Sequence, residues 1–345
     1  MRQRMSLRIA FMAIALTAGV ATAGAQAPQG LERLRKQIEQ AITPAQGDVG
    51  VAIKHLETGA EVGVRAEEPF PLASAYKLPI LAEVYAQVRS GRVRFEERYE
   101  LKPSDQHLGS GDISVNFDLP GVTMNVRNLA NLMMMVSDNS ATDILLTRVG
   151  AANVTAHMRA LGLNGIRVDR TTQELLLDYG GQDTERLKNL LLQELRPLVR
   201  RPPEDEAARL ARDTRYANDP RDQATPRDMT RLLELLWRGQ VVDADASKAI
   251  LELMKRCRTG AARLKGLLPR DAVVAHKTGS VGGTIDDVGI VYLPYDAGHV
   301  AISVLSKRTR ADSEDVERVI AEIARYAYDY FVFTAPAASA GPSSR

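Results

Sequence analysis

Ser74 and Lys77 stand three residues apart in the segment Ser-Ala-Tyr-Lys, which is the one Ser-x-x-Lys sequence in the chain. If this segment opens a helix, the two side chains lie one turn apart on the same face. A serine hydroxyl is a weak nucleophile without a base, and an amine that a positive environment holds neutral can take its proton. The pair therefore predicts nucleophilic catalysis, and Pro79 predicts a local distortion of the helix soon afterwards.

Two further motifs follow along the chain. Ser137-Asp138-Asn139 lies in a region of helical periodicity, and Lys277-Thr278-Gly279 lies on an expected strand. Taken alone, each motif has an ordinary structural interpretation: a capping serine, a solvated loop, or a strand with an exposed lysine. Together and in this order, Ser-x-x-Lys, Ser-Asp-Asn and Lys-Thr-Gly form the set of class A β-lactamases and penicillin-binding proteins.

The chain resembles the class A serine β-lactamases over nearly its whole length beyond the N-terminal segment, and most of all their PER-like extended-spectrum branch. The resemblance also rests on residues 136–143, 218–226, 263–269 and 275–279. It implies a β-lactamase that hydrolyses the β-lactam amide through an acyl-enzyme on Ser74. The alternatives are a penicillin-binding protein, D-alanyl-D-alanine peptidase or esterase with slow deacylation, and a β-lactam sensor that stays acylated.

The resemblance implies a role for each matching residue. Ser74 would be the nucleophile, Lys77 and Ser137 would relay protons, and Asn139 would bind the side-chain amide of the substrate. The substrate carboxylate would lie against Lys277, Thr278 and Arg263, and the backbone N–H groups of Ser74 and Ser280 would form the oxyanion hole. Arg170 and Asp222 would form the ion pair that closes the neck of the omega loop.

The deacylating base is where the chain departs from the family. The family has a Glu two residues after the omega-loop arginine, in a Glu-x-x-Leu-Asn motif. Counting from Arg170 reaches Thr172, which cannot act as a base. A two-residue insertion would instead align Glu174, which begins Glu-Leu-Leu-Leu-Asp. We favour Glu174 as the base; in the alternative it is an ordinary solvated acid at a helix start.

A longer insertion follows within the omega loop, over residues 179–217. Residues 185–201 place leucines at helical spacing, and residues 203–216 suggest a second helix. The segment is either a helical flap over the cleft or an inert surface addition.

The elements that must position these residues change in type along the chain. Helical spacing over 30–41 precedes two strands, 48–56 and 61–64, which form a hairpin. Helical periodicity then runs from Ser74 to about Arg258, and strands return at 273–276, 288–293 and 300–306, before a last helix over 313–331. The expected fold class is α/β (α+β): an antiparallel sheet flanked by N- and C-terminal helices, plus an all-helical domain.

This pattern predicts a discontinuous sheet domain, residues 26–87 and 259–333, around a helical domain, residues 88–258, with a cleft between them. Residues 334–345 contain mainly Ala, Ser, Pro and Gly, which predicts a disordered tail.

Residues 1–25 read as a secretory leader: three arginines and no acids, an apolar run over 9–20, and a small-residue cleavage site ending at Ala25. An uncleaved anchor is the alternative, although the run is short for a span. We therefore expect a periplasmic or secreted protein.

Composition limits the partners. Hydrophobic residues make up 45% and charged residues 26% of the 345, as in a soluble globular protein. Beyond the leader the charges nearly cancel, which gives no electrostatic case for nucleic acid. Cys257 is the single cysteine, so no intramolecular disulfide can form and a small buried residue is expected; His276 should pack beside the active-site strand. The five histidines show no zinc-type pairing, so we expect no metal. The short apolar run predicts no stable membrane span. The resemblance implies a β-lactam as the partner, and we expect no cofactor and a monomer.

Overall fold

The computed structural model describes residues 23–117, 119, 121–199 and 205–334. The predicted leader lies outside the described residues except for its last three, which begin helix α1 (Ala23–Ala41). The predicted tail also lies outside them, except for Thr334 at the end of α13 (Ser313–Thr334). Within the described ranges, no helix is long and apolar enough to cross a membrane.

A five-stranded antiparallel sheet forms the centre of the fold, in the order β2-β1-β9-β8-β7. The first and last parts of the chain both contribute to it, as the sequence predicts. The strands are β1 (Asp48–His55), β2 (Glu61–Val64), β7 (Val273–Val281), β8 (Thr284–Tyr292) and β9 (His299–Lys307). Strand β7, which carries Lys-Thr-Gly, therefore lies at an edge of the sheet.

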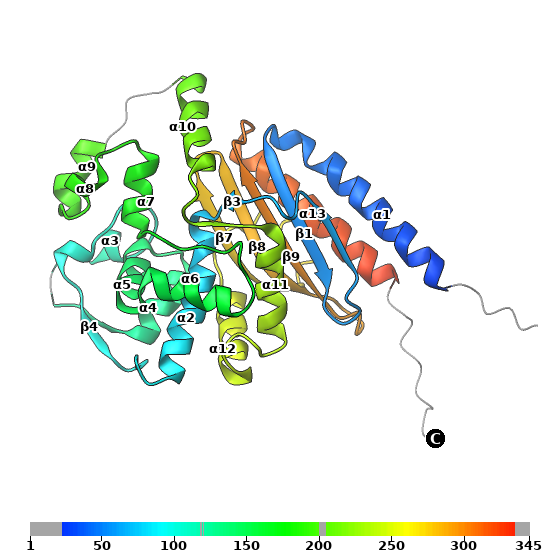
Figure 1. Ribbon diagram of the computed structural model, residues 1–345, viewed down its shortest axis with the longest axis horizontal. Helices are drawn as coiled ribbons and strands as arrows, with labels where there is room; N and C mark the ends of the chain where they lie inside the picture. The colour runs from blue at the N-terminus through cyan, green and yellow to red at the C-terminus, as the bar shows by residue number, and fades with distance from the viewer. Residues whose placement is uncertain (1–22, 118, 120, 200–204, 335–345) are drawn as a thin grey trace, which may run out of the picture.

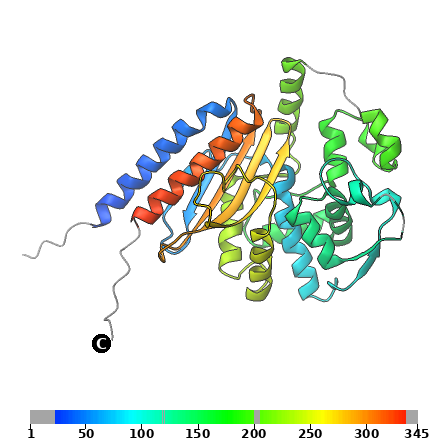
Figure 2. The ribbon, with the colours of Figure 1, turned by 180° about the vertical axis from the view of Figure 1, so that it is seen from behind.

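Both faces of this sheet are covered, because its central strands are apolar at successive positions rather than at alternate ones. On β9, Val300 and Ile302 pack in a core with α1 and α13, which lie side by side across one face (Figures 1 and 2). Ala301 and Leu305 point the other way, into a larger core shared with the helical region. The chain has the predicted fold class, with helices on both sides of an antiparallel sheet.

The helical region lies against the opposite face (Figure 1). Its longer helices are α2 (Lys77–Arg89), α4 (Val126–Met135), α5 (Asn139–Val149), α6 (Ala151–Ala160), α7 (Thr172–Tyr179), α11 (Pro226–Trp237) and α12 (Ala244–Lys255). The short elements are η1 (Thr43–Ala45), β3 (Phe70–Pro71), η2 (Ala73–Tyr76), β4 (Arg98–Glu100), η3 (Pro103–Asp105), α3 (Ile113–Asn116), β5 (Thr123–Asn125) and β6 (Gln223–Ala224).

Several helices begin at a side chain that accepts a hydrogen bond from a free backbone N–H group. Asp138 caps α5 by accepting from Ala141 N, and Thr225 caps α11 by accepting from Asp228 N. Helix α2 begins at Lys77, after the 3-10 turn η2 that holds Ser74. Pro79 therefore occupies the first turn of α2, where its missing N–H group removes no helical hydrogen bond. The predicted distortion at Pro79 is absent, since α2 continues through it to Arg89.

The described part of the omega-loop insertion contains three helices: α8 (Thr184–Leu187), α9 (Leu192–Val199) and α10 (Glu206–Asn218). The helical spacing over 185–201 corresponds to two short helices and not to one, and residues 200–201 lie outside the described residues. Leu190 N bonds to Leu187 O as the first helix ends, and the Glu194 carboxylate accepts from Leu191 N to start the second. A local cap thus overrides the continuous leucine spacing.

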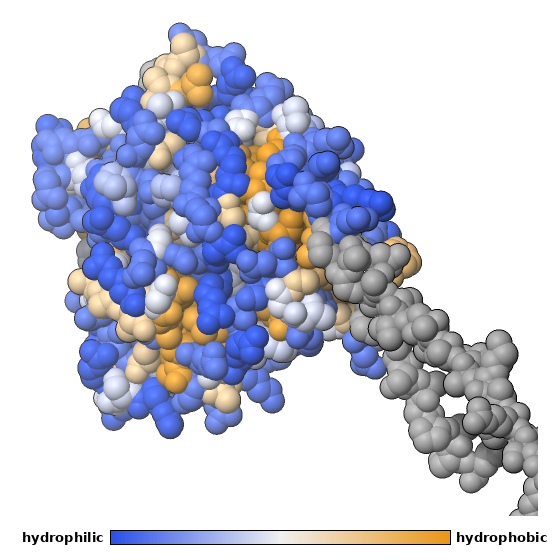
Figure 3. Space-filling view, turned by 45° about the vertical axis from the view of Figure 1, so that its right-hand side comes forward, coloured by the Kyte–Doolittle hydropathy of each residue, from blue (hydrophilic) through white to orange (hydrophobic). Residues whose placement is uncertain are grey.

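The insertion is packed onto the rest of the molecule at two apolar clusters. Leu187 and Leu195 pack with Leu177 of α7 and with Leu108. Tyr216 of α10 packs with Tyr179 and Leu175 of α7, and the two tyrosine rings are 5.5 Å apart. On the face shown in Figure 3, hydrophilic residues predominate and apolar ones gather in a few limited patches.

Candidate active site

Ser74 lies where the helical region meets the edge of the sheet. It belongs to η2, directly after Ala73, whose φ of 40° is in the left-handed region. A Cβ atom at Gly279 of β7 would lie 2.6 Å from Leu72 O and 3.1 Å from Ser74 N. Only glycine lets this turn approach the strand so closely, which explains the glycine of the Lys-Thr-Gly motif.

Lys77, at the start of α2 directly after the turn that holds Ser74, is fully buried. Its Nζ lies 2.7 Å from Ser137 O, 2.7 Å from Asn139 Oδ1 and 3.1 Å from Ser137 Oγ. The first two oxygens can only accept, whereas the hydroxyl can also donate. An ammonium donates to all three oxygens, whereas a neutral amine donates to two and accepts from the Ser137 hydroxyl with its lone pair.

Lys277 approaches the same hydroxyl from β7. Its Nζ lies 3.0 Å from Ser137 Oγ and 2.8 Å from Thr278 O. Ser137 can therefore accept from Lys277 while it donates to Lys77. This direction requires a protonated Lys277 and a neutral Lys77.

The electrostatics agree with this assignment. Burial lowers the pKa of Lys77 well below its usual range, and the positive charge of Lys277 lowers it further. Burial lowers the pKa of Lys277 to about 8, with Cys257 and Asp287 opposing the shift. Lys277 therefore keeps its proton near neutral pH, and both burial and the charge of Lys277 favour the neutral form of Lys77.

The Ser-Asp-Asn turn between α4 and α5 holds these groups in place. Ser137 has a φ of 57°, a strained value for a residue with a side chain, and its carbonyl accepts from both Lys77 and Ser110. Asp138 is structural, since its carboxylate accepts from Ala141 N and Ile113 N. Asn139 Nδ2 donates to Leu108 O at 2.7 Å, which orients the amide.

The free edge of β7 presents backbone donors to the cleft. Ile285 N donates to Ser306 Oγ on the β9 side at 2.8 Å. Its partner Ser280 is therefore in a non-hydrogen-bonded pair, and the N–H group of Ser280 points towards the free edge, where η2 lies. The N–H groups of Ser74 and Ser280 thus lie on facing walls of the cleft.

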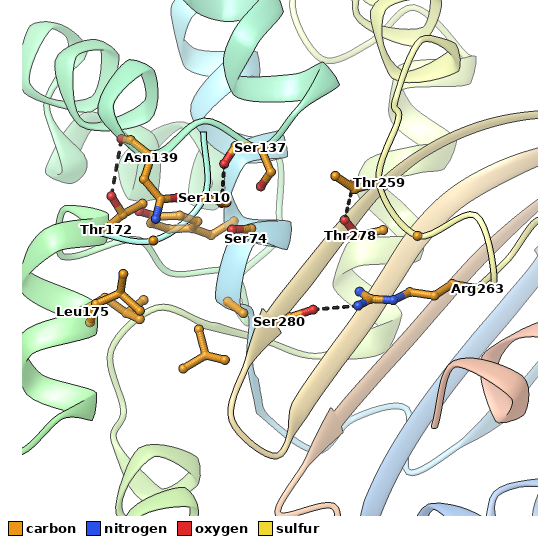
Figure 4. Close-up of a pocket in the computed structure, with 16 residues that line it drawn as sticks. Ser74, Ser110, Ser137, Asn139, Thr172, Leu175, Thr259, Arg263, Thr278 and Ser280 are labelled. Atoms are coloured by element: carbon orange, nitrogen blue, oxygen red, sulfur yellow. Dashed lines mark hydrogen bonds between the residues drawn. The ribbon is translucent and has the colours of Figure 1, made fainter. Parts of the chain in front are cut away.

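Arg263 is buried behind β7, and Figure 4 shows its guanidinium directed at Ser280. Its Nη2 donates to Ser280 Oγ at 2.6 Å, while Nη1 donates to the carbonyls of Gly279 and Asp286. Nε donates to Glu317 of α13 at 3.0 Å. The guanidinium brings positive charge to the cleft mainly through Ser280.

A cavity of about 260 Å³ lies above Ser74. Ser110, Ser137 and Asn139 line it from the helical side, and Thr278 and Ser280 line it from β7 (Figure 4). The structure therefore brings together the side chains of all three motifs around one space. Lys77 and Lys277 contact it through the hydroxyl of Ser137.

The omega loop is closed at its neck by charge. Arg170 Nε donates to Asp222 Oδ2 at 2.7 Å, as the resemblance implies, and Nη1 also bonds to Asp178 and Asp219. Asp222 Oδ1 accepts from Asp169 N. These contacts fix the start of α7 relative to the end of the insertion.

The structure contradicts the expectation that Glu174 reaches the site. Its carboxylate accepts from Thr171 N at 3.0 Å and from Thr171 Oγ1 at 2.9 Å, in a capping box at the start of α7. Thr172, Leu175 and Leu176 line the cavity instead. On a helix, Glu174 is about 200° around the axis from Thr172 and so faces away. Thr172, which direct counting from Arg170 reaches, is the residue of this turn that lines the cavity.

Thr172 is anchored by residues that the sequence interpretation left out. Asp143 of α5 accepts from Thr172 N at 2.6 Å, from Thr172 Oγ1 at 2.7 Å and from Gln173 N at 3.0 Å. His107 Nδ1 lies 2.5 Å from the same carboxylate. Asp143 stands four residues after Asn139, on the same face of α5. This spacing in the sequence could have indicated that Asp143 lies near the site.

Cys257 and His276 lie behind Lys277, and both are buried as predicted. His276 Nδ1 lies 2.9 Å from Asp287 Oδ1. Burial opposes both charges, but Asp287 raises the pKa of His276 to about 9, while His276 and Lys277 lower that of Cys257 to about 6. Cys257 also contacts Thr259, which bonds to Thr278 at the cavity.

Comparison with known proteins agrees with this geometry. The model of the β-lactamase enzyme family matches residues 33–331, and the chain belongs to this family. It is 25% identical over 311 residues to β-lactamase VEB-1 of Pseudomonas aeruginosa, covering 87% of this chain and 91% of that one. It is 27% identical over 296 residues to β-lactamase SME-1 of Serratia marcescens, covering 85% and 87%. A β-lactamase structure from Chitinophaga pinensis superimposes with a TM-score of 0.69 at 26% identity, covering 86% and 98%.

Proposed function

We propose that this protein is a serine β-lactamase that opens the β-lactam ring through an acyl-enzyme on Ser74. The observation that carries the proposal is the chain Lys277–Ser137–Lys77 beside Ser74, with both Nζ atoms within 3.1 Å of Ser137 Oγ. It supplies a base for the nucleophile and a proton for the leaving group. The family membership supports a β-lactam as the substrate.

In acylation, neutral Lys77 takes the proton of Ser74 as Oγ attacks the β-lactam carbonyl carbon. The carbonyl oxygen becomes an anion between the N–H groups of Ser74 and Ser280, which stabilise it. The C–N bond then breaks. Ser137 gives its proton to the departing nitrogen and receives the one held by Lys77, so Lys77 is neutral again in the acyl-enzyme.

Substrate binding uses the positive wall of the cleft. The substrate carboxylate would lie against Thr278 Oγ1 and Ser280 Oγ, with Lys277 and Arg263 behind them. Asn139, oriented by Leu108 O, would donate to or accept from the side-chain amide of the substrate. The Arg-rich leader supports export to the periplasm or the medium, and we propose that the enzyme acts there as a monomer.

The proposal is tested by following the absorbance of a penicillin and a cephalosporin as the ring opens, with wild type and with Ser74→Ala. We expect wild type to hydrolyse at least one of them and Ser74→Ala to lose hydrolysis while keeping the circular dichroism of the folded protein. Undiminished hydrolysis by Ser74→Ala would contradict the proposal.

A further inference from the structure

We infer that Lys77, and not a carboxylate, is the general base for deacylation as well as for acylation. The inference rests on the proposed function, because it concerns the second half of the same reaction. Water attacks the Ser74 ester effectively only if a base takes its proton. The identity of that base depends on which groups the cleft presents.

Among the described residues, the sixteen that line the cavity include no Asp, Glu or His. The ionisable side chains among them are Tyr76 and Arg263. Burial raises the pKa of Tyr76 well above its usual range, so it holds its proton. Arg263 remains protonated in any protein environment. None of the lining side chains can therefore accept a proton from water.

The acids nearest to the cleft are committed elsewhere. Glu174 accepts two hydrogen bonds from Thr171, and its other oxygen lies 3.6 Å from Lys188 Nζ. Asp143 already accepts from Thr172 N, Thr172 Oγ1 and Gln173 N and pairs with His107, so its two oxygens are occupied by these partners. Thr172 itself offers a hydroxyl, which can position a water molecule but cannot take its proton at neutral pH.

Lys77 is left as the proton acceptor, because its Nζ lies 3.1 Å from Ser137 Oγ and 2.7 Å from Asn139 Oδ1, and both residues line the cavity with Ser74. Its amine is buried and loses its proton readily because of that burial and of Lys277. In deacylation, Lys77 takes a proton from water while the water oxygen bonds to the acyl carbon. The C–O bond to Ser74 then breaks, Oγ keeps the electron pair, and Lys77 returns the proton to it. The products are the ring-opened acid and free enzyme.

The test measures deacylation separately from acylation. Enzyme acylated with a penicillin is freed of excess drug, and the loss of the adduct is followed by intact mass spectrometry from pH 5 to 9. We compare wild type, Glu174→Gln, Thr172→Glu and the isosteric control Thr172→Gln. If no variant forms an adduct, the proposed function fails; the outcomes below concern the base alone.

We expect Glu174→Gln to deacylate within about 2-fold of wild type. Wild-type deacylation should slow as pH falls, with an apparent pKa above the carboxylic acid range of about 4. Thr172→Glu, which introduces a carboxylate at the cavity wall, should deacylate at least about 10-fold faster than Thr172→Gln. A deacylation rate of Glu174→Gln that is 10-fold lower than that of wild type would overturn the inference. An apparent pKa near 4 for wild-type deacylation would overturn it as well. Those two measurements do not depend on the folding of Thr172→Glu.

Discussion

The Nζ of Lys77 lies 3.1 Å from the Oγ of Ser137, and the two groups form the centre of a directed hydrogen-bond chain. Lys277 donates to the Ser137 hydroxyl from the other side, at 3.0 Å. Two adjacent buried ammonium groups would repel each other strongly. Burial lowers the pKa of Lys77 well below its usual range, and the charge of Lys277 lowers it further.

Arg263→Ala should weaken hydrolysis of substrates that carry a free carboxylate. The variant removes the positive charge behind Ser280 and the hydrogen bond to Ser280 Oγ. Charge-assisted hydrogen bonds contribute about 1.5–3 kcal/mol, so kcat/KM should fall roughly 10- to 100-fold. The methyl ester of the same substrate is the control, because its loss should be smaller. Equal losses for acid and ester would mean that Arg263 only supports β7.

Leu195→Ala should loosen helix α9 and raise KM. Leu195 is fully buried between α7 and Leu108, whose carbonyl orients Asn139. Loss of a buried leucine side chain costs about 2–5 kcal/mol. Leu198→Ala is the matched control, since Leu198 on the same helix is 49% exposed. We expect a lower Tm and a higher KM for Leu195→Ala but not for Leu198→Ala. Wild-type kinetics in Leu195→Ala would indicate that the insertion is inert.

His107→Asn should reduce stability most at low pH. Burial opposes the charged imidazolium, but Asp143 outweighs it and raises the pKa of His107. The stabilisation is therefore fully present below the unfolded value of about 6.5 and is lost as pH rises through the raised pKa. The Tm difference between wild type and His107→Asn, measured from pH 6 to 9, should shrink as pH rises. A constant or growing difference would contradict the ion pair with Asp143.

Cys257→Ala should move the basic limb of the kcat/KM profile to lower pH. Lys277 must be protonated to bind a carboxylate, and burial places its pKa at about 8, with Cys257 holding it up. Without the thiolate, the pKa of Lys277 should fall. Cys257→Asp, which keeps a negative charge near Lys277, is the control and should leave the limb near its wild-type position. An unmoved limb in Cys257→Ala would show that the buried thiol is neutral.

The sequence predicted the sheet, the helical region and the three motifs, because each depends on local periodicity or on a short segment that is similar to the family. The relative placement of the two sides of the cleft could not be predicted, since the approach of η2 to Gly279 depends on tertiary packing. The misplacement of Glu174 had a visible local signal: Thr171 and Glu174 have the Thr-x-x-Glu spacing of a capping box. The break between α8 and α9 also has a local cause, the Glu194 carboxylate that accepts from Leu191 N, which the continuous leucine spacing concealed.

The most direct test of the account is time-resolved intact mass spectrometry of the enzyme with a penicillin, followed by peptide mapping of the adduct. We expect an increase in mass equal to that of the whole penicillin, located on Ser74, that forms first and then disappears as hydrolysed product accumulates. Lys77→Ala should form the adduct much more slowly. Hydrolysis without an adduct, or an adduct on a residue other than Ser74, would contradict the account.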